Sequence, residues 1–188
     1  HEISTATLDD YSDNRSDYDL VFSNNVIQHV DDPGHFMQGL AQLVGHSGLV
    51  AIYCPDGGLP GEDLLWADHR YSLSPANLAS LGQTAGLYVE AWSPGGDQRN
   101  LEGKQLILLS KEKDSGGAEI PKDSPGELYG GRHEYFALWP RIEARLSEAC
   151  TAHEGSIFNF GASTWSYLLR AYCPRYWQQA EACVVDDG

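Results

Sequence analysis

Residues 18–30 have the sequence Tyr-Asp-Leu-Val-Phe-Ser-Asn-Asn-Val-Ile-Gln-His-Val. The first half is a short apolar run, which is typical of a strand buried on both faces of a parallel sheet. Asp31, Asp32 and Pro33 follow it. Because carboxylates are favoured at a helix cap and proline in the first turn, a helix should begin there. This stretch therefore predicts a buried strand that leads into a helix.

Residues 34–54 complete the pattern. Apolar side chains recur at spacings of three and four, as on one face of a helix, at Phe36, Leu40, Leu43 and Val44. Residues 45–48 contain two glycines and should break the helix, and residues 49–54 are again apolar. Strand, helix and strand with short joints predict α/β architecture with a mostly parallel sheet.

The middle of the chain is expected to complete this sheet. Ser74-Pro75 should start another helix, and Gly86 should end it. Two more strands are expected over residues 88–92 and 105–110. Residues 111–131 are charged and rich in Gly, Pro and Ser, so we expect a linker there.

A second, incomplete module is expected after the linker. Its predicted elements are a helix, a strand, a helix and a strand, over residues 135–151, 156–160, 165–172 and 182–185. The predicted division is thus a sheet domain over residues 1–110, the linker over 111–131 and the start of a βαβ module over 132–188. Two strands are too few for a sheet that is stable alone.

Composition limits the classes of function. The chain has 188 residues, of which 41% are hydrophobic, with five Trp and ten Tyr, so it can form a packed core and whole-chain disorder is excluded. Twelve basic against 27 acidic side chains leave a formal net charge of −15. This charge argues against nucleic acids and anionic membranes as partners.

We expect the cytoplasm as the compartment. No apolar stretch is long enough for a membrane span, and residues 1–5 lack the features of a secretory signal. The first residue is not methionine, which indicates that the natural chain begins earlier. Neither the histidines nor the cysteines have the spacing of a metal site, so we expect no metal. Buried free thiols are expected at Cys54, Cys150, Cys173 and Cys183.

Polar side chains stand at the end of the first predicted strand, at Ser23, Asn24 and Asn25, and His29 follows one turn later. In an open α/β sheet, ligands bind beyond the carboxyl ends of the strands. The hydroxyl, the amides and the imidazole can therefore hold the polar parts of a cofactor. An Asn pair is equally typical of a turn cap, and the residues alone favour neither interpretation.

Three segments of this region belong together. They are residues 18–24, which begin Tyr-Asp, the segment His29-Val-Asp-Asp-Pro, and residues 47–52 followed by Pro55-Asp56. As a set they resemble class I S-adenosylmethionine-dependent methyltransferases, in their fourth strand, the next helix and the fifth strand. The resemblance covers roughly residues 1–110. It implies a partial Rossmann-like sheet, S-adenosylmethionine as cofactor, and cofactor-binding residues at Ser23, Asn24, Asn25 and His29.

Residues 66–75, Trp-Ala-Asp-His-Arg-Tyr-Ser-Leu-Ser-Pro, narrow the resemblance. They are similar to the acidic-His segment of nucleotide-sugar C-methyltransferases, and Gly95-Gly96 matches a glycine pair near the substrate of that family. Phe160-Gly161-Ala162 and Val185-Asp186-Asp187 are similar to two signatures of its C-terminal Rossmann-like domain. The resemblance therefore implies that residues 132–188 begin a second Rossmann-like module.

Two features depart from that family. Its G-x-G-x-G loop and an acidic residue after the second strand hold the cofactor, and neither occurs in this sequence, which begins at about the third strand. We therefore expect the donor site to be incomplete in this chain. Trp66 also occupies the place of a tyrosine to which the family assigns the role of base, and an indole cannot abstract a proton.

The candidate catalytic residues lie close to Trp66: His69, Asp68 and Tyr71. An imidazole can be neutral and accept a proton near pH 7, so His69 is the first candidate for the base and Tyr71 the second. The resemblance places these residues and Gly95-Gly96 on the acceptor side. A loop histidine that only hydrogen-bonds the backbone is the alternative interpretation.

The resemblance implies methyl transfer to a small polar acceptor, such as a nucleotide-linked sugar. One alternative is a non-catalytic methyltransferase-like module that binds or acts as a scaffold. Another is a nucleotide-binding oxidoreductase built on a phosphate-binding turn at Gly161-Ala162-Ser163, which has one of the three glycines of a dinucleotide fingerprint. The sequence does not fix the acceptor, the methylated atom or the oligomeric state.

Overall fold

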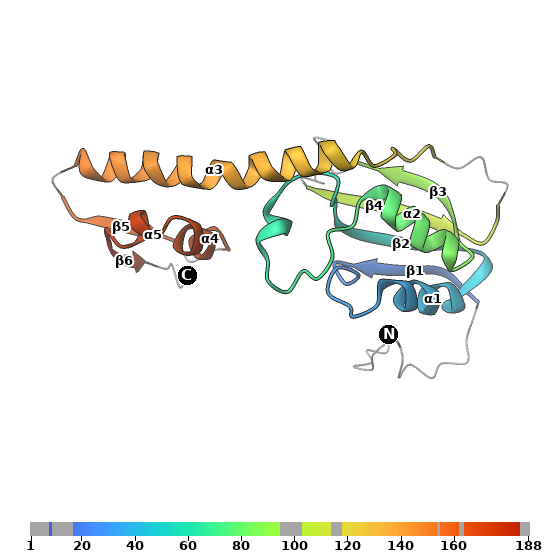
Figure 1. The fold of residues 1–188 in the computed structure, drawn as a ribbon. Coiled ribbons are helices and arrows are strands. Elements are labelled where there is room, and N and C mark those ends of the chain that lie inside the picture. Colours follow the sequence, from blue (N-terminus) through green and yellow to red (C-terminus); the bar gives the residue numbers. More distant parts are fainter. Residues whose placement is uncertain are drawn as a thin grey trace. The chain divides into compact units, whose positions relative to one another are not determined.

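The structure is a computed structural model, and it describes residues 8, 17–94, 103–113, 118–153, 155–161 and 164–184. The chain divides into two compact units, His1–Leu128 and Tyr129–Gly188. Each unit has a sheet that contains a parallel pair of strands, so the fold is mixed α/β (Figure 1). Among the described residues, no helix combines the length and the hydropathy that a membrane span requires.

The sheet of the first unit has the strand order β1-β2-β4-β3. Its strands are β1 (Tyr18–Asn24), β2 (Val44–Pro55), β3 (Tyr88–Ser93) and β4 (Lys104–Ser110). β1 and β2 are parallel, as predicted, whereas β4 is antiparallel to β2 and to β3. The prediction of a mostly parallel sheet is therefore wrong. Residues 94–103 between β3 and β4 are too few for the crossover of about a dozen or more residues that parallel strands need.

Helix α1 (Pro33–Leu43) begins where the sequence predicts it. The Asp32 carboxylate caps the helix by accepting hydrogen bonds from the backbone amides of Gly34 at 2.9 Å and His35 at 3.0 Å. These bonds satisfy two of the amides that lack partners in a first helical turn. The Asp-Asp-Pro signal is thereby confirmed.

The predicted end of the helix is confirmed, since α1 ends at Leu43. Residues 45–48 do not form a joint between the helix and the next strand, however, because β2 begins at Val44, directly after α1. Val44 is already paired with Tyr18 of β1. A Cβ atom at Gly48 would overlap the Tyr18 carbonyl. This glycine therefore allows two strands to approach closely and does not form a loop.

Helix α2 (Pro75–Thr84) confirms the predicted Ser-Pro start. The Ser74 hydroxyl accepts a hydrogen bond from the Asn77 amide at 3.1 Å, and the Asn77 side chain accepts one from the Ser74 amide at 3.3 Å. This reciprocal pair is a capping box. Gly86 follows the helix with φ of 79°, a value that glycine adopts without strain.

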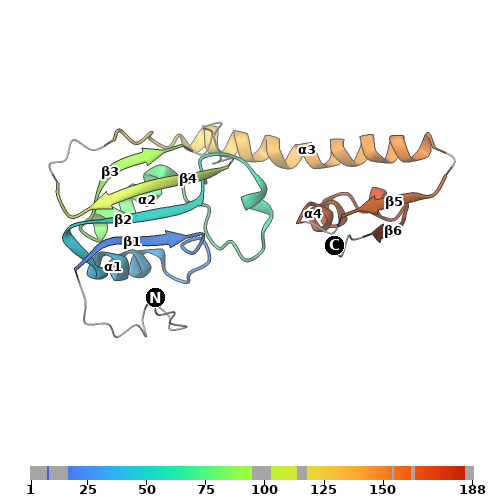
Figure 2. The ribbon, with the colours of Figure 1, turned by 180° about the vertical axis from the view of Figure 1, so that it is seen from behind.

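The two helices cover the same face of the four-stranded sheet (Figure 1). Between them and the sheet lies a core of fully buried side chains: Ile27, Met37, Val44, Val50, Ile52, Leu78, Leu87, Ile107 and Leu109. On the opposite face, which Figure 2 shows from behind, Leu20 and Phe22 of β1 are each 58% exposed. The prediction that β1 is buried on both faces is thus wrong for the described residues.

Helix α3 (Pro125–Thr151) begins at the end of the first unit and continues into the second. The sequence predicts a helix only over residues 135–151. The first ten residues of α3 therefore precede the predicted helix, and seven of them, residues 125–131, fall within the predicted linker. The Ser124 carbonyl accepts a hydrogen bond from the Leu128 amide at 2.9 Å and closes the first turn. Ser124-Pro125 is the same helix-start signal as Ser74-Pro75. The residues that follow it are rich in glycine and charge, so they lack the regular apolar spacing by which a helix is recognised.

The sheet of the second unit consists of β5 (Ile157–Phe160) and β6 (Ala180–Val184), which are parallel. Helix α4 (Thr164–Tyr172) and the short helix α5 (Pro174–Trp177) connect them. The strand, helix and strand order is confirmed, and α5 was not predicted. Trp139 of α3, Leu168 and Cys173 are the buried hydrophobic residues described in this unit.

Candidate functional site

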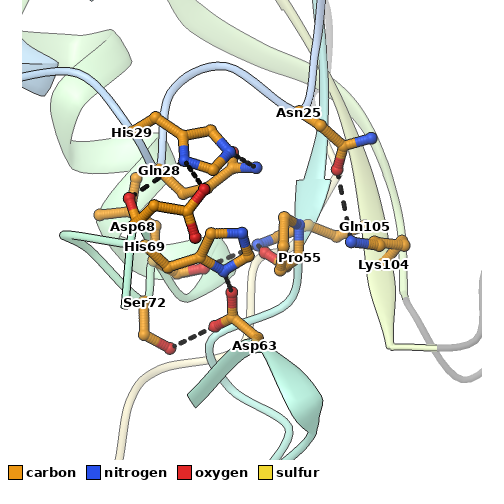
Figure 3. Close-up of polar contacts among 11 residues, drawn as sticks. Asn25, Gln28, His29, Pro55, Asp63, Asp68, His69, Ser72, Lys104 and Gln105 are labelled. Atoms are coloured by element: carbon orange, nitrogen blue, oxygen red, sulfur yellow. Dashed lines mark hydrogen bonds and ion pairs between the residues drawn. The ribbon is translucent and has the colours of Figure 1, made fainter. Parts of the chain in front are cut away.

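The site is formed where a loop that follows β2 packs against the turn that follows β1. The Gln28 carbonyl accepts hydrogen bonds from the backbone amides of Arg70 at 2.9 Å and Tyr71 at 3.3 Å. The ring of His29 also bonds to the Asp68 carbonyl, with 3.1 Å between Nδ1 and the oxygen. His29 and Asp68 are 39 positions apart in the sequence, but they lie together in the structure (Figure 3). The family resemblance assigns His29 to the donor side of the site and Asp68 to the acceptor side.

At the centre of the site, His69 Nδ1 lies 2.5 Å from Asp63 Oδ1 (Figure 3). Both side chains are largely buried, with 12% and 9% of their surface exposed. A carboxylate only accepts hydrogen bonds, so Nδ1 carries a proton and donates it. When the ring is neutral, the second nitrogen, Nε2, is therefore a proton acceptor. Ser72 fixes the carboxylate by donating its hydroxyl to Asp63 Oδ2 at 3.0 Å.

A buried glutamine holds the loops of the site in place. Gln105 of β4 is fully buried, and its Nε2 donates to the carbonyls of Pro55 at 3.1 Å and Leu73 at 2.8 Å. The Gly57 amide donates to the same Leu73 carbonyl at 2.9 Å. The sheet therefore anchors both the exit of β2 and the segment that carries Ser72.

His29 and Asp68 complete the cluster around His69. The rings of His29 and His69 meet edge to face, with 4.7 Å between their centroids. The Asp68 carboxylate lies 3.5 Å from His29 Nδ1, and 74% of its side chain is exposed. His69 and Asp68 are two of the candidate catalytic residues that the family resemblance implies. The structure shows that Asp63, and not Asp68, orients His69, whereas Asp68 contacts His29.

Tyr71, the second candidate for the base, points elsewhere. Its hydroxyl donates to the Asp31 carbonyl at 2.9 Å. The neighbouring Arg70 forms an ion pair with the Asp31 carboxylate. Both side chains therefore attach the loop to the start of α1, and the Tyr71 proton is already engaged.

The residues predicted to bind the cofactor after β1 have some features of a binding site and some of a simple turn. Asn25 has a φ of 51°, its amide donates to the Tyr53 carbonyl at 2.8 Å, and its Oδ1 accepts from Lys104 Nζ at 3.4 Å, all of which suits a turn. Asn24 is exposed. Ser23 Oγ and Gln28 Oε1 are buried and have no hydrogen-bond partner among the described residues. Two orphaned polar atoms therefore remain at this corner.

Two cavities share Leu59, in the loop after β2. The smaller one, of about 60 Å³, is lined by Asp63, His69, Trp66 and Lys104 among others. The larger one, of about 350 Å³, is lined by apolar residues such as Trp92 and by the charged side chains of Asp56, Lys122, Asp123 and Glu127. Its volume is in the range of ~300–1,000 Å³ that is usual for small-molecule sites.

Cys54 lies near this site but has no suitable chemistry. Burial raises the pKa of its thiol to about 12, the carboxylates of Asp56 and Asp63 add to this shift, and Lys104 opposes it. Because the thiolate is the reactive form, the thiol is inert at neutral pH. Cys54 therefore packs in the core.

Sequence reasoning missed Asp63 and Ser72. Asp63 stands in no motif, and Ser72, although it lies within residues 66–75, was given no role there. Asp63 lies in a 3-10 helix (Glu62–Leu65) six positions before His69, and Ser72 lies in irregular loop three positions after it. Only the folded loop brings the three together. Gly95-Gly96, Ala162, Ser163 and residues 185–187 lie outside the described residues, so the interpretations that depend on them stay predictions.

Comparison with known proteins gives a distant similarity of fold. No family model and no curated protein matches the sequence. Among solved structures, the chain is similar to a chain of the "complex between the Haloferax volcanii Trm112 methyltransferase activator and the putative methyltransferase", with a TM-score of 0.44 and 14% identity. The match covers 56% of this chain and spans 59% of the length of that chain.

Proposed function

We propose that this chain carries the acceptor-side base and part of the donor site of an S-adenosylmethionine-dependent methyltransferase. The observation that carries the proposal is the 2.5 Å contact between Asp63 Oδ1 and His69 Nδ1, beside a cavity at the end of β2. A histidine held in one tautomer by a carboxylate is the usual arrangement of a general base. The resemblance of residues 18–56 and 66–75 supplies the reaction class.

The chemical task of His69 is to remove a proton from the acceptor. Transfer of a methyl group from a sulfonium requires an aligned, deprotonated acceptor atom. Nε2 of His69 takes the proton, and the resulting imidazolium is stabilised by the Asp63 carboxylate. Ser72 keeps that carboxylate in position through its hydroxyl.

The corner after β1 fits one side of a polar cofactor. Ser23 Oγ and Gln28 Oε1 are buried without partners among the described residues, and Asn24 is exposed beside them. Such orphaned atoms are costly unless a ligand or water satisfies them. S-adenosylmethionine, when bound, supplies the methyl group. The residues that would hold it are Ser23, Asn24, Asn25 and His29.

The larger cavity favours a small polar acceptor without phosphates. Among the described residues, three carboxylates (Asp56, Asp123 and Glu127) and one cation, Lys122, line it. Phosphate oxygens need cationic or amide partners, which an acidic lining does not provide. A nucleotide-linked sugar would therefore have to place its phosphates outside this cavity.

The experiment measures methyl transfer from radiolabelled S-adenosylmethionine by the native protein to a panel of sugars, amines and nucleotide-linked sugars. His69→Asn is expected to lower kcat by roughly 10²–10⁴-fold, the usual contribution of a general base. Glu143→Gln is the control, because it removes a buried carboxylate that is bonded to Arg175 within the second unit, and it should leave kcat unchanged.

Two results would overturn the proposal. Full activity of His69→Asn would remove the role of His69. Absence of product together with absence of S-adenosylhomocysteine binding in calorimetry would instead favour a binding or scaffold module. Methylation of a nucleotide-linked sugar, but of no amine, would contradict the inference, drawn from the acidic lining of the cavity, that the acceptor has no phosphates.

A further inference from the structure

The structure assigns a binding site for a divalent metal ion of the zinc class to His29, Asp68 and His69. One nitrogen of each histidine and one carboxylate oxygen of Asp68 lie within 4.8 Å of one another. Sequence spacing did not reveal this cluster, because His29 follows β1 whereas Asp68 and His69 belong to the loop after β2 (Figure 3). The inference does not depend on the proposed function.

The donor set suits zinc chemically. Two imidazoles and one carboxylate are a common set of three protein ligands for Zn²⁺, with water at the fourth position. Harder ions such as Mg²⁺ and Ca²⁺ prefer oxygen ligands only. The site is therefore expected to select a first-row transition ion.

His69 is already oriented as a metal ligand. Its Nδ1 donates to Asp63 at 2.5 Å, which leaves Nε2 as the free donor atom for a metal. Metal-bound histidines commonly donate their other ring nitrogen to a carboxylate, which fixes the ring and strengthens the ligand. Ser72, bonded to the same carboxylate at 3.0 Å, extends this support.

The other two ligands can close on the ion. Tetrahedral bonds of ~2.0–2.1 Å place neighbouring donor atoms about 3.3 Å apart. Because the donor atoms lie within 4.8 Å of one another, no pair has to approach by more than about 1.5 Å. The Asp68 side chain is 74% exposed, so little packing opposes a change of its rotamer. His29 has to exchange only one contact, either with Gln28 Nε2 at 3.2 Å or with the Asp68 carbonyl at 3.1 Å.

The test is calorimetric titration of the native protein with ZnCl₂, without methyl donor or acceptor. We expect one ion per chain, and a Kd raised at least about tenfold by His29→Ala and by Asp68→Ala. Asp63→Asn should raise Kd by roughly 10–100-fold, the usual effect of losing the carboxylate behind a histidine ligand. His46→Ala is the matched control, since His46 is exposed on β2 and should not change Kd.

Co²⁺ gives a second readout that does not depend on activity. Its visible absorption should show the intensity of four-coordination in the native protein and lose it in His29→Ala and His69→Ala, with near-native circular dichroism. No binding, or binding that His29→Ala and Asp68→Ala leave unchanged, would overturn the site. Inhibition of methyl transfer by Zn²⁺, which competes for Nε2 of His69, is expected only if the proposed function also holds.

Discussion

The structure has a buried carboxylate in each unit, Asp63 in the first and Glu143 in the second, and the two differ in their hydrogen-bond partners. Asp63 is bonded to an imidazole and a hydroxyl. Glu143 accepts from the Arg175 backbone amide at 2.7 Å and from its guanidinium at 3.0 and 2.9 Å. Both carboxylates are mostly buried, and both oxygens of each accept hydrogen bonds.

The partners decide what each carboxylate can do. An imidazole gains and loses a proton near neutral pH, so the pair at Asp63 can take part in chemistry. A guanidinium is always charged, so the pair at Glu143 ties α3 to α5 and has no proton to exchange. Asp63 also lines a cavity together with His69. The comparison teaches that burial of a carboxylate identifies a site only together with its partner.

The largest expected effect comes from Asp63→Asn. Because Ser72 donates its hydroxyl to Oδ2 at 3.0 Å, the amide oxygen of the variant is expected at that position and the amide nitrogen opposite His69. The nitrogen cannot accept the proton of His69 Nδ1, so the ring is expected to turn or to change tautomer. We expect kcat for methyl transfer to fall by roughly 10²–10⁴-fold, as for other carboxylates that orient a base. Nitrogen NMR of labelled histidine should show the tautomer change.

Glu143→Gln is the counterpart of that variant and should leave both kcat and the His69 tautomer unchanged. Equal loss of activity in the two variants would show that the difference between the two carboxylates is not functional. Melting temperatures distinguish a loss of chemistry from a loss of fold.

The second effect is on stability and concerns the loop beside Asp63. A Cβ atom on Gly57 would lie 2.5 Å from the Ser72 carbonyl carbon and 2.6 Å from the Leu73 nitrogen. Gly57→Ala should therefore cost about 1–3 kcal/mol of unfolding free energy, as overpacking usually does, and should displace Ser72. Denaturant unfolding measures this cost.

Gly61→Ala is the matched control in the same loop, since a Cβ there meets nothing within 4 Å. It is expected to be close to neutral. Unchanged stability of Gly57→Ala would mean that the loop is not held against residues 72–73.

The smallest effect is expected in the second unit and depends on pH. Hydrogen bonds from Arg175 lower the pKa of Glu143 below its ordinary value of 4.5. A lowered pKa stabilises the folded state above the ordinary value, and this contribution is lost as the pH falls through the folded value. Glu143→Gln should therefore lower the melting temperature by a few degrees at pH 7, and the difference should shrink below pH 4.5.

Glu148→Gln on the same helix is the control, because Glu148 is exposed. It should match the wild type at every pH. A difference between Glu143→Gln and the wild type that stays constant down to strongly acidic pH would contradict the assigned pair.

Local sequence rules predicted the elements whose signals are contained in a few neighbouring residues. The cap at Asp32, the capping box at Ser74 and the positive φ of Gly86 are of this kind. The apolar run of β1 was also evident, as was the order of strand, helix and strand in both units. Each signal depends on contacts within one turn or one strand, so the sequence alone contains it.

The direction of the strands and the burial of their faces could not be predicted from neighbouring residues in the sequence. The antiparallel β4 and the exposed Leu20 and Phe22 depend on which elements pack against which face, and an apolar run reads the same in either case. The start of α3 at Pro125 was hidden because its turn is stabilised without an apolar stripe.

The residue types of the candidate site could be read from the sequence, because His69, Asp68, His29 and Ser23 stand near motifs or strand ends. Their partners could not be read, because the contacts of Asp63 and Ser72 with the imidazole arise only when Gln105 and Gly57 fix the loop after β2. The sequence by itself therefore determined which groups are present and which elements carry them. The tertiary structure decided which groups meet, because hydrogen bonds between distant loops depend on positions that only packing of the sheet defines.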